Sequence, residues 1–190
     1  GRVRPLRIRC QRDRRARTSF GTRRASALGG ERTNGMNSQR PDFDLISHSP
    51  QQTRNIGTHL GAVLEPGDVV LLFGQIGAGK TLLTQGIAQG LGVSGYVQSP
   101  TFTLAVEHAG RTAAGEDIAL YHIDLYRIDA PGDIDTFGHE EYLDDPRGIV
   151  VMEWPERLGA ELPEEHLLIT IEYLADTKRR LAFYARGARY

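Results

Sequence analysis

Long hydrophobic runs are absent from this sequence, and cysteine is almost absent. No apolar run approaches the roughly 20 residues that a helix needs to cross a bilayer, so we expect no membrane-spanning segment. The single cysteine, Cys10, excludes an internal disulfide and a cysteine metal cluster, and it fits a reducing cytoplasmic setting best. The chain has 190 residues, 39% hydrophobic and 25% charged, which suits one α/β domain of ordinary size.

The net charge of −1 conceals two parts of opposite charge. Residues 1–35 carry eleven arginines against two acids, a formal charge of +9, which leaves −10 for residues 36–190. The first part lacks helical or strand periodicity, and its composition predicts disorder. Three interpretations stay open for it: an RNA-binding arm, a transit peptide, or a segment upstream of a true start at Met36. We place a single folded domain in residues 36–190.

The strongest signal is a glycine-rich stretch between a strand and a helix. Residues 74–81 read G-Q-I-G-A-G-K-T, after the apolar run 69–73 and before the helix-permissive segment 82–91. This is the P-loop pattern G-x-x-x-x-G-K-[ST] in the frame that it requires. Glycines let main-chain N–H groups approach phosphate oxygens, and the N-terminus of the following helix adds partial positive charge. The stretch therefore predicts a nucleotide phosphate site.

The polar residues of this loop have distinct predicted roles. Lys80 supplies a point charge for the β- and γ-phosphates, and the Thr81 hydroxyl is placed to ligate a magnesium ion that bridges them. The expected cofactors are ATP and Mg²⁺. The residues predicted to surround the phosphates are Gly74, Gly77, Ala78, Gly79, Lys80, Thr81 and Leu82.

Two carboxylates stand at the ends of predicted strands. Asp124 ends the β-rich run 118–124, and Glu153 follows the buried run 148–152. P-loop NTPases use an acid at a strand end to orient magnesium or its water shell, but spacing does not decide between these two, and Asp124 could instead cap a turn. His122 shares a side of its strand with Asp124, where we expect a packed histidine.

Three further side chains near these acids each have two interpretations. Ser99 and Thr101 follow the P-loop helix, where a hydroxyl-bearing segment can sense the γ-phosphate as a switch; a plain turn before a strand is equally compatible. Trp154, next to Glu153, is expected in the core, the alternative being packing over the nucleotide or a partner.

A strand and a helix are predicted before the P-loop. Residues 43–47 favour a strand. Ser49 then reads as a helix N-cap, with Pro50 at the first helical position and Gln52 completing a capping box. The helix is expected to end in the turn at 65–68. Its predicted apolar stripe comprises Ile56, Leu60, Val63 and Leu64.

Two β-hairpins are predicted after the P-loop helix. Runs 103–108 and 118–124 have no room for a helix between them, so we expect them to pair antiparallel. Runs 167–173 and 179–184 form a second hairpin, and an acidic amphipathic helix is predicted over 131–143. The predicted fold is α/β, a P-loop NTPase-like three-layer sandwich with a mixed central sheet, an antiparallel hairpin insertion and a C-terminal β-hairpin.

Four blocks of this sequence occur in the order found in one family. The blocks are G-Q-I-G-A-G-K-T at 74–81, S-P-T-F-T-L at 99–104, Y-H-I-D-L-Y-R at 121–127 and E-W-P-E at 153–156. The chain thus resembles the TsaE family, small P-loop ATPases of bacterial N6-threonylcarbamoyladenosine (t6A) tRNA modification, over roughly residues 43–186. A P-loop alone would indicate only a superfamily, and the four blocks together are far more specific. Residues 1–35 have no counterpart in the family.

The resemblance implies roles for the two carboxylates that spacing left undecided. By the family pattern, Thr81 and Glu153 bind magnesium, and Asp124 is required for ATP turnover. Which carboxylate activates water stays open.

The resemblance also implies nucleotide contacts outside the P-loop. One lies in the first helical turn, near Gln51 and Thr53. Another is a basic residue of the C-terminal hairpin, where Lys178 or Arg179 is the nearest match. From the residues alone, this basic cluster could reach a phosphate or simply be a solvated turn.

The resemblance further implies partners. In the family, TsaE works with TsaB and TsaD; TsaD carries the threonylcarbamoyl transfer to tRNA, and ATP hydrolysis by TsaE resets or sustains that cycle. The chain would meet tRNA indirectly, in keeping with the charge of −10 on residues 36–190, which disfavours direct binding to phosphates. No arginine finger is evident, so slow intrinsic ATPase activity, accelerated by partners, is expected.

Two other functions fit a P-loop. A small-molecule kinase would need a lid with phosphate-binding arginines, but the corresponding region is a hairpin and an acidic helix with Asp133, Asp135, Glu140 and Glu141. A nucleotide-switched binding subunit, in which occupancy and not hydrolysis is the output, is the other alternative. A variant that binds ATP without hydrolysing it would separate an ATPase from such a switch.

Overall fold

The computed structural model describes residues 40–128 and 137–190. The predictions for the Arg-rich residues 1–35 lie outside the described residues. So does the first part of the acidic helix predicted over 131–143, of which Glu140–Leu143 forms the short helix α4.

One mixed sheet organises the described residues. In spatial order the strands are β1 (Phe43–Ser47), β7 (Lys178–Arg186), β6 (His166–Ala175), β2 (Val69–Phe73), β5 (Gly148–Glu153), β4 (Asp117–Asp124) and β3 (Ala105–Arg111). Strands β6, β2, β5 and β4 run parallel to one another, while β1, β7 and β3 pair antiparallel at the flanks. Strands β2, β5 and β4 are largely apolar and buried on both faces, so helices must cover both sides of the sheet.

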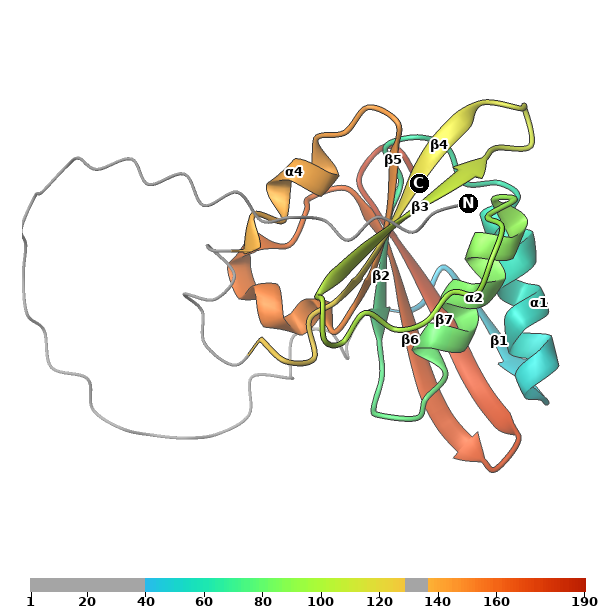
Figure 1. Ribbon diagram of the computed structural model, residues 1–190. Helices are drawn as coiled ribbons and strands as arrows, with labels where there is room; N and C mark the ends of the chain where they lie inside the picture. The colour runs from blue at the N-terminus through green and yellow to red at the C-terminus, as the bar shows by residue number, and fades with distance from the viewer. Residues whose placement is uncertain (1–39, 129–136) are drawn as a thin grey trace, which may run out of the picture. The chain divides into compact units, whose positions relative to one another are not determined.

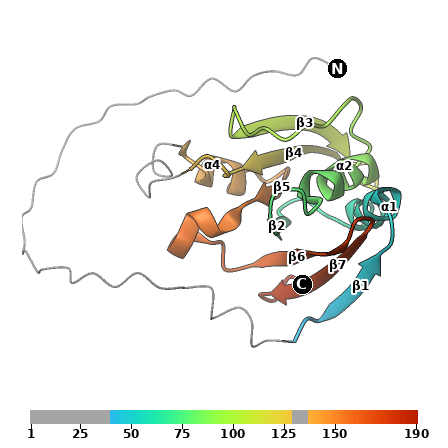
Figure 2. The ribbon, with the colours of Figure 1, turned by 90° about the horizontal axis from the view of Figure 1, so that it is seen from below.

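The two faces of the sheet are covered unequally. Helices α1 (Pro50–Gly61) and α2 (Lys80–Gly90) lie together on one face (Figure 1). Of the helices in the described residues, α4 and the 3₁₀ helix η1 (Pro155–Glu161) lie on the other face (Figure 2). A separate hydrophobic cluster fills each interface, with Leu83 and Ile87 on the α2 side and Leu158 on the η1 side. The predicted three-layer sandwich is confirmed, with one thin outer layer.

Both predicted hairpins are confirmed. Strands β3 and β4 pair antiparallel, with β3 beginning at Ala105 and extending to Arg111. Strands β6 and β7 pair antiparallel around the turn at residues 176–177, and β7 also pairs with β1. Within residues 40–128 and 137–190, none of the helices has the length and apolar character that crossing a membrane requires.

Glycines bring α1 and α2 unusually close together. An added Cβ at Gly57 would lie 2.3 Å from the Leu83 carbonyl oxygen, and one at Gly86 would lie 2.1 Å from the Arg54 carbonyl oxygen. Such distances leave no room for any side chain, so the two backbones touch. This contact fixes the N-terminal end of α1 beside the P-loop.

The predicted apolar stripe of α1 is wrong at Val63, whereas Leu64 is buried and Ile56 and Leu60 pack against the core. The helix ends at Gly61, and the side chain of Val63 is 71% exposed. Small residues, Thr53, Gly57 and Gly61, form the buried face, because the backbone of α2 occupies the space that larger side chains would need.

The start of α1 follows the prediction with one difference. Ser49 Oγ accepts a hydrogen bond from Gln52 N (3.1 Å), as an N-cap should. Gln52 Oε1 accepts from His48 N at 2.8 Å, one residue before the partner that a capping box would use.

Candidate functional site

The P-loop joins β2 to α2 with a backbone that only glycine allows at its two ends. Gly79, the N-cap of α2, has a φ of 111°. At Gly74 an added Cβ would lie 2.6 Å from the Ile171 carbonyl oxygen. The loop therefore leads from β2 into the first turn of α2, where the P-loop pattern predicts that main-chain N–H groups surround a phosphate.

Lys80 is folded back over this loop. Its Nζ donates to the carbonyl oxygens of Gly74 (2.6 Å) and Gln75 (3.1 Å), and it lies 3.9 Å from the centroid of the Trp154 ring. The side chain is 5% exposed. Burial lowers the pKa of the Lys80 ammonium, and the carboxylates of Glu153, Glu156 and Asp124 counteract this. The ammonium is thus held at the loop by groups that a bound phosphate can replace.

Thr81 and Glu153 form the second part of the site. Thr81 Oγ1 donates to Glu153 Oε2 at 3.2 Å, and the other carboxylate oxygen, Oε1, lies 2.8 Å from His122 Nε2. Glu153 ends β5, next to β2, which leads into the P-loop. The parallel pairing of these two strands places the acid beside the first turn of α2.

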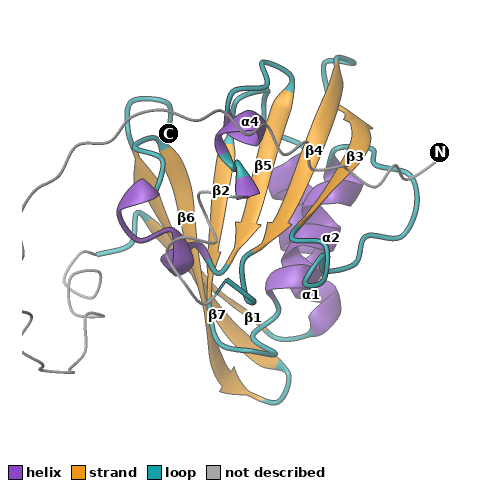
Figure 3. Cartoon of the chain, turned by 60° about the vertical axis from the view of Figure 1, so that its left-hand side comes forward, coloured by secondary structure: helices purple, strands orange, loops and turns teal. Residues whose placement is uncertain are grey.

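Asp124 forms the third part. It is the register partner of Glu153 across β4 and β5, whose arrows end at the same edge of the sheet in Figure 3. Its Oδ2 accepts hydrogen bonds from Ser99 Oγ and from Thr101 Oγ1 (2.6 Å), and its Oδ1 accepts from Tyr126 N at 3.0 Å. Asp124 therefore holds the hydroxyl-bearing segment 99–101 against the end of β4.

These parts line one open cleft of about 490 Å³. Among the described residues, Lys80 is the single basic side chain of its lining. The lining comprises Ile76, Gly77, Gly79, Lys80, Thr81, Leu82, Ser99, Thr101, Asp124, Tyr126, Glu153 and Trp154. Sequence-predicted residues from the P-loop, from the 99–101 segment and from both strand ends thus converge.

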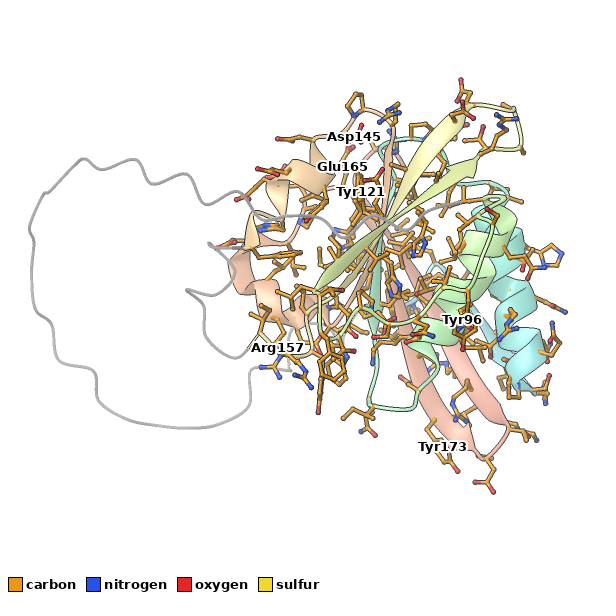
Figure 4. All side chains as sticks on the ribbon, viewed as in Figure 1. Tyr96, Tyr121, Asp145, Arg157, Glu165 and Tyr173 are labelled. Carbon is orange, nitrogen blue, oxygen red and sulfur yellow. The ribbon has the colours of Figure 1, made fainter. Side chains whose placement is uncertain are left out.

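A smaller cleft of about 180 Å³ adjoins the other side of the P-loop. The backbone of Gly77–Gly79 separates it from the main cleft, and Thr53 and Arg179 lie in its wall. Arg179 Nε donates to the Ala78 carbonyl oxygen (3.0 Å), and its guanidinium stacks at 4.6 Å on Tyr173, which lies near the end of the β6–β7 hairpin (Figure 4). The C-terminal hairpin therefore reaches the P-loop through Arg179.

Two predicted nucleotide contacts are not brought to these clefts. Gln51 is exposed, donates to Asn55 Oδ1 at 2.9 Å, and is outside the linings of both. Lys178 is exposed and is also outside both linings, whereas its neighbour Arg179 contacts the P-loop. Thr53 is buried, with its hydroxyl 2.8 Å from Ser47 Oγ.

Some site residues were not predicted, or were predicted differently. Trp154, expected in the core, is half-buried: it packs against the second hydrophobic cluster, and its ring also covers Lys80. Its φ of 61° lies in the left-handed region, and Tyr126 stacks at 5.1 Å on its ring. The sequence signal for a site residue at Trp154 was its place in an E-W pair directly after a strand. That pair does not reveal the strained backbone at Trp154.

The donor atoms of the site suit a hard cation together with phosphate. Thr81 and Glu153 offer a hydroxyl and a carboxylate oxygen side by side, the ligand types that Mg²⁺ prefers. Within residues 40–128 and 137–190, no group of three or more His, Cys, Asp or Glu side chains is arranged to hold a metal ion. A cation bound here would complete its coordination with phosphate oxygens and water.

Comparison with known proteins gives one consistent match. The model of the family described as "Threonylcarbamoyl adenosine biosynthesis protein TsaE" matches residues 47–181. The tRNA threonylcarbamoyladenosine biosynthesis protein TsaE of Treponema pallidum is 40% identical over 136 residues, covering 72% of this chain and 96% of that protein. The protein of the same name from Bacillus subtilis is 37% identical over 142 residues, covering 75% and 85%.

A solved structure agrees with the sequence matches. The crystal structure of Bacillus subtilis YdiB superposes with a TM-score of 0.63 at 34% identity, covering 78% of this chain and 88% of that one. The likeness therefore extends over most of the P-loop fold and is not confined to the glycine-rich loop.

Proposed function

Because this chain belongs to the TsaE family, we propose that it binds and hydrolyses ATP with Mg²⁺ and thereby sustains t6A modification of tRNA. The observation that carries the proposal is the Thr81–Glu153 pair beside Lys80 in the P-loop cleft. These groups are the ones that a triphosphate and its cation need, and they come from two separate segments of the chain, the P-loop and the end of β5.

The P-loop residues have the first role in this mechanism. The main-chain N–H groups of residues 77–81 surround the phosphates, and Lys80 exchanges its carbonyl partners at Gly74 and Gln75 for phosphate oxygens. Its ammonium then stabilises charge that develops on the transferred phosphoryl group. The Trp154 ring keeps water away from one side of the ammonium, which strengthens this interaction.

Thr81 and Glu153 would hold the magnesium ion through Oγ1 and Oε2, which already lie together. When bound, the ion neutralises charge on the β- and γ-phosphates. Asp124 is the second acid at this edge, and we assign it the task of orienting the attacking water. Ser99 and Thr101, which hydrogen-bond to Asp124, would respond to the presence of the γ-phosphate.

The smaller cleft beside the P-loop is our proposed site for the rest of the nucleotide. Thr53 and Arg179 form parts of its wall, in agreement with the helix and hairpin contacts expected from the family. Gln51 and Lys178 stay candidates on sequence grounds alone.

The main cleft contains one basic side chain among the described residues, so this chain by itself supplies little positive charge for the transition state. We therefore infer slow hydrolysis by the isolated protein and acceleration by partners, which the family pattern suggests are TsaB and TsaD. The protein would meet tRNA only indirectly, through that complex. We also propose that it acts in the cytoplasm.

ATP hydrolysis by the purified protein tests the chemistry. We expect Mg²⁺-dependent release of phosphate that Lys80→Ala abolishes, while Arg111→Ala, an exposed position on the β3–β4 hairpin, leaves it unchanged. Undiminished Mg²⁺-dependent hydrolysis by Lys80→Ala would overturn the site assignment. ATP binding with no hydrolysis, even with partners present, would instead favour a nucleotide-switched binding subunit.

A further inference from the structure

The carboxylate of Glu153 is buried between two hydrogen-bond donors. Thr81 Oγ1 donates to Oε2 at 3.2 Å, and His122 Nε2 lies 2.8 Å from Oε1. The side chain of Glu153 is 3% exposed, and that of His122 is 0% exposed. A carboxylate in such a place is costly unless both oxygens have partners, so each of these two contacts is needed to hold the side chain in place.

The surroundings of His122 define which ring nitrogen carries hydrogen. Nδ1 is buried and has no hydrogen-bond partner among the described residues. A hydrogen on Nδ1 would be a buried donor without an acceptor there, whereas Nε2 faces a carboxylate oxygen, so we place the hydrogen on Nε2. His122 then donates one fixed hydrogen bond to Glu153 Oε1.

This hydrogen bond selects the orientation of the carboxylate. With Oε1 engaged by His122, Oε2 points to Thr81 and to the lining of the P-loop cleft. The imidazole is held rigidly because β4 is buried on both faces and pairs with β5 and β3. Without the imidazole, the Glu153 carboxylate would be free to turn and would no longer present the same oxygen to the cleft.

We propose that His122 is a positioning residue for the magnesium site: its Nε2–H holds Glu153 so that Oε2 and Thr81 Oγ1 together receive the cation of the ATP complex. The inference rests on the proposed function, since it concerns the same site. The P-loop chemistry by itself does not require this buried histidine, and the proposal gives it a role. Residues that orient metal ligands typically change metal affinity by about 10–100-fold when they are replaced.

The test is a magnesium titration of ATP binding by the full-length protein. A fluorescent ATP analogue is titrated at a fixed protein concentration, first with excess EDTA and then with rising Mg²⁺. We expect His122→Leu to need at least about tenfold more Mg²⁺ than the wild type for half-maximal binding of the analogue. Binding of the analogue in EDTA should be unchanged. His122→Gln, whose side-chain amide can donate from nearly the same point, should restore much of the wild-type response.

His108→Leu is the matched control. His108 is also a buried histidine of the β3–β4 hairpin and lies near His122, but among the described residues no hydrogen bond joins it to Glu153. The control should titrate with Mg²⁺ as the wild type does. Thermal unfolding of each variant shows whether it is folded. If His122→Leu fails to fold, His122→Gln is compared with His122→Asn, whose shorter side chain does not reach the position of Nε2. Only His122→Gln should respond like the wild type.

The outcomes separate this inference from the proposed function. If His122→Leu needs no more Mg²⁺ than the wild type, or if it loses binding in EDTA and in Mg²⁺ to the same extent, His122 has no positioning role. If Gln and Asn titrate alike, the Nε2–H bond is not the cause. If the wild type itself shows no Mg²⁺-dependent ATP binding, the proposed function fails first.

Discussion

Asp124 and Glu153 are register partners at the ends of β4 and β5, yet they hydrogen-bond to different parts of the site. Glu153 bonds to Thr81 at the start of α2, whereas Asp124 bonds to Ser99 and Thr101 in the segment that precedes β3. The spacing of the sequence left the roles of the two acids undecided. Their different partners support a division of labour, with Glu153 at the cation and Asp124 at the hydroxyl-bearing segment.

Replacing the charge on Asp124 should separate binding from turnover. Asn at this position still offers one oxygen to Ser99 or Thr101 but removes the negative charge. We expect kcat to fall by about 10²–10³-fold, the range for losing one electrostatic group at a reacting centre, with the Kd for ATP nearly unchanged. Steady-state ATPase assays and equilibrium binding measure the two quantities. Asp117→Asn, at the exposed start of β4, is the control, and a loss of ATP binding as large as the loss of kcat would contradict the role.

The C-terminal hairpin should contribute one basic residue to nucleotide binding, and the structure favours Arg179. Its guanidinium donates to Ala78 O and stacks on Tyr173, whereas Lys178 is exposed. Arg179→Ala should raise the Kd for ATP by about tenfold, because a hydrogen bond to a charged group contributes about 1.5–3 kcal/mol. Lys178→Ala should leave the Kd within about twofold. The reverse order of effects in a binding titration would show that the hairpin turns its lysine to the nucleotide.

The contact between α1 and α2 should tolerate no added methyl group. In Gly57→Ala the new Cβ would meet Leu83 O at 2.3 Å, so the helices must separate. We expect a loss of about 1–3 kcal/mol in the free energy of unfolding, or a drop in Tm of about 2–4 °C per kcal/mol. Calorimetry measures both. Val63→Ala, just beyond the same helix and 71% exposed, should change Tm very little. An unchanged Tm for Gly57→Ala would mean that the helices are not in backbone contact.

Tyr190 predicts a pH dependence of stability in the alkaline range. Its hydroxyl donates to Val69 O (3.2 Å) and accepts from Val69 N (2.8 Å), and burial is the main cause that raises its pKa to about 12. An unfolded tyrosine has a pKa near ~10, so its contribution is complete below that pH and is lost as pH rises toward 12. The wild type should therefore lose its stability advantage over Tyr190→Phe across that interval. The measurement is the difference in unfolding free energy between the wild type and Tyr190→Phe, followed from about pH 9 to about pH 12. A difference that stays constant over this interval would contradict the prediction.

Much of the fold was predictable because local rules act on short segments. The alternation and apolar runs of the strands, the turn between β6 and β7, and the Ser49–Pro50 helix start each depend on neighbouring residues alone. The P-loop was the clearest of these, since the pattern itself prescribes the strand before it and the helix after it.

Other features depend on contacts between distant segments and were not readable. Gly57 and Gly61 look like weak points in a helix until the backbone of α2 is placed against them, which is why the predicted stripe failed at Val63. The choice between Lys178 and Arg179 needs the register of β7, because neighbouring residues of a strand face opposite sides. The link from His122 to Glu153 needs the pairing of β4 with β5.

The most direct measurement of the central claim is t6A formation on unmodified tRNA in a reconstituted system with TsaB, TsaD and a supply of threonylcarbamoyl-adenylate. Residues 36–190 of this protein are added with ATP, with a non-hydrolysable ATP analogue, or as the Lys80→Ala variant. We predict many rounds of tRNA modification only when the wild-type protein and ATP are both present. Equal modification without the protein, or with the analogue in place of ATP, would contradict it.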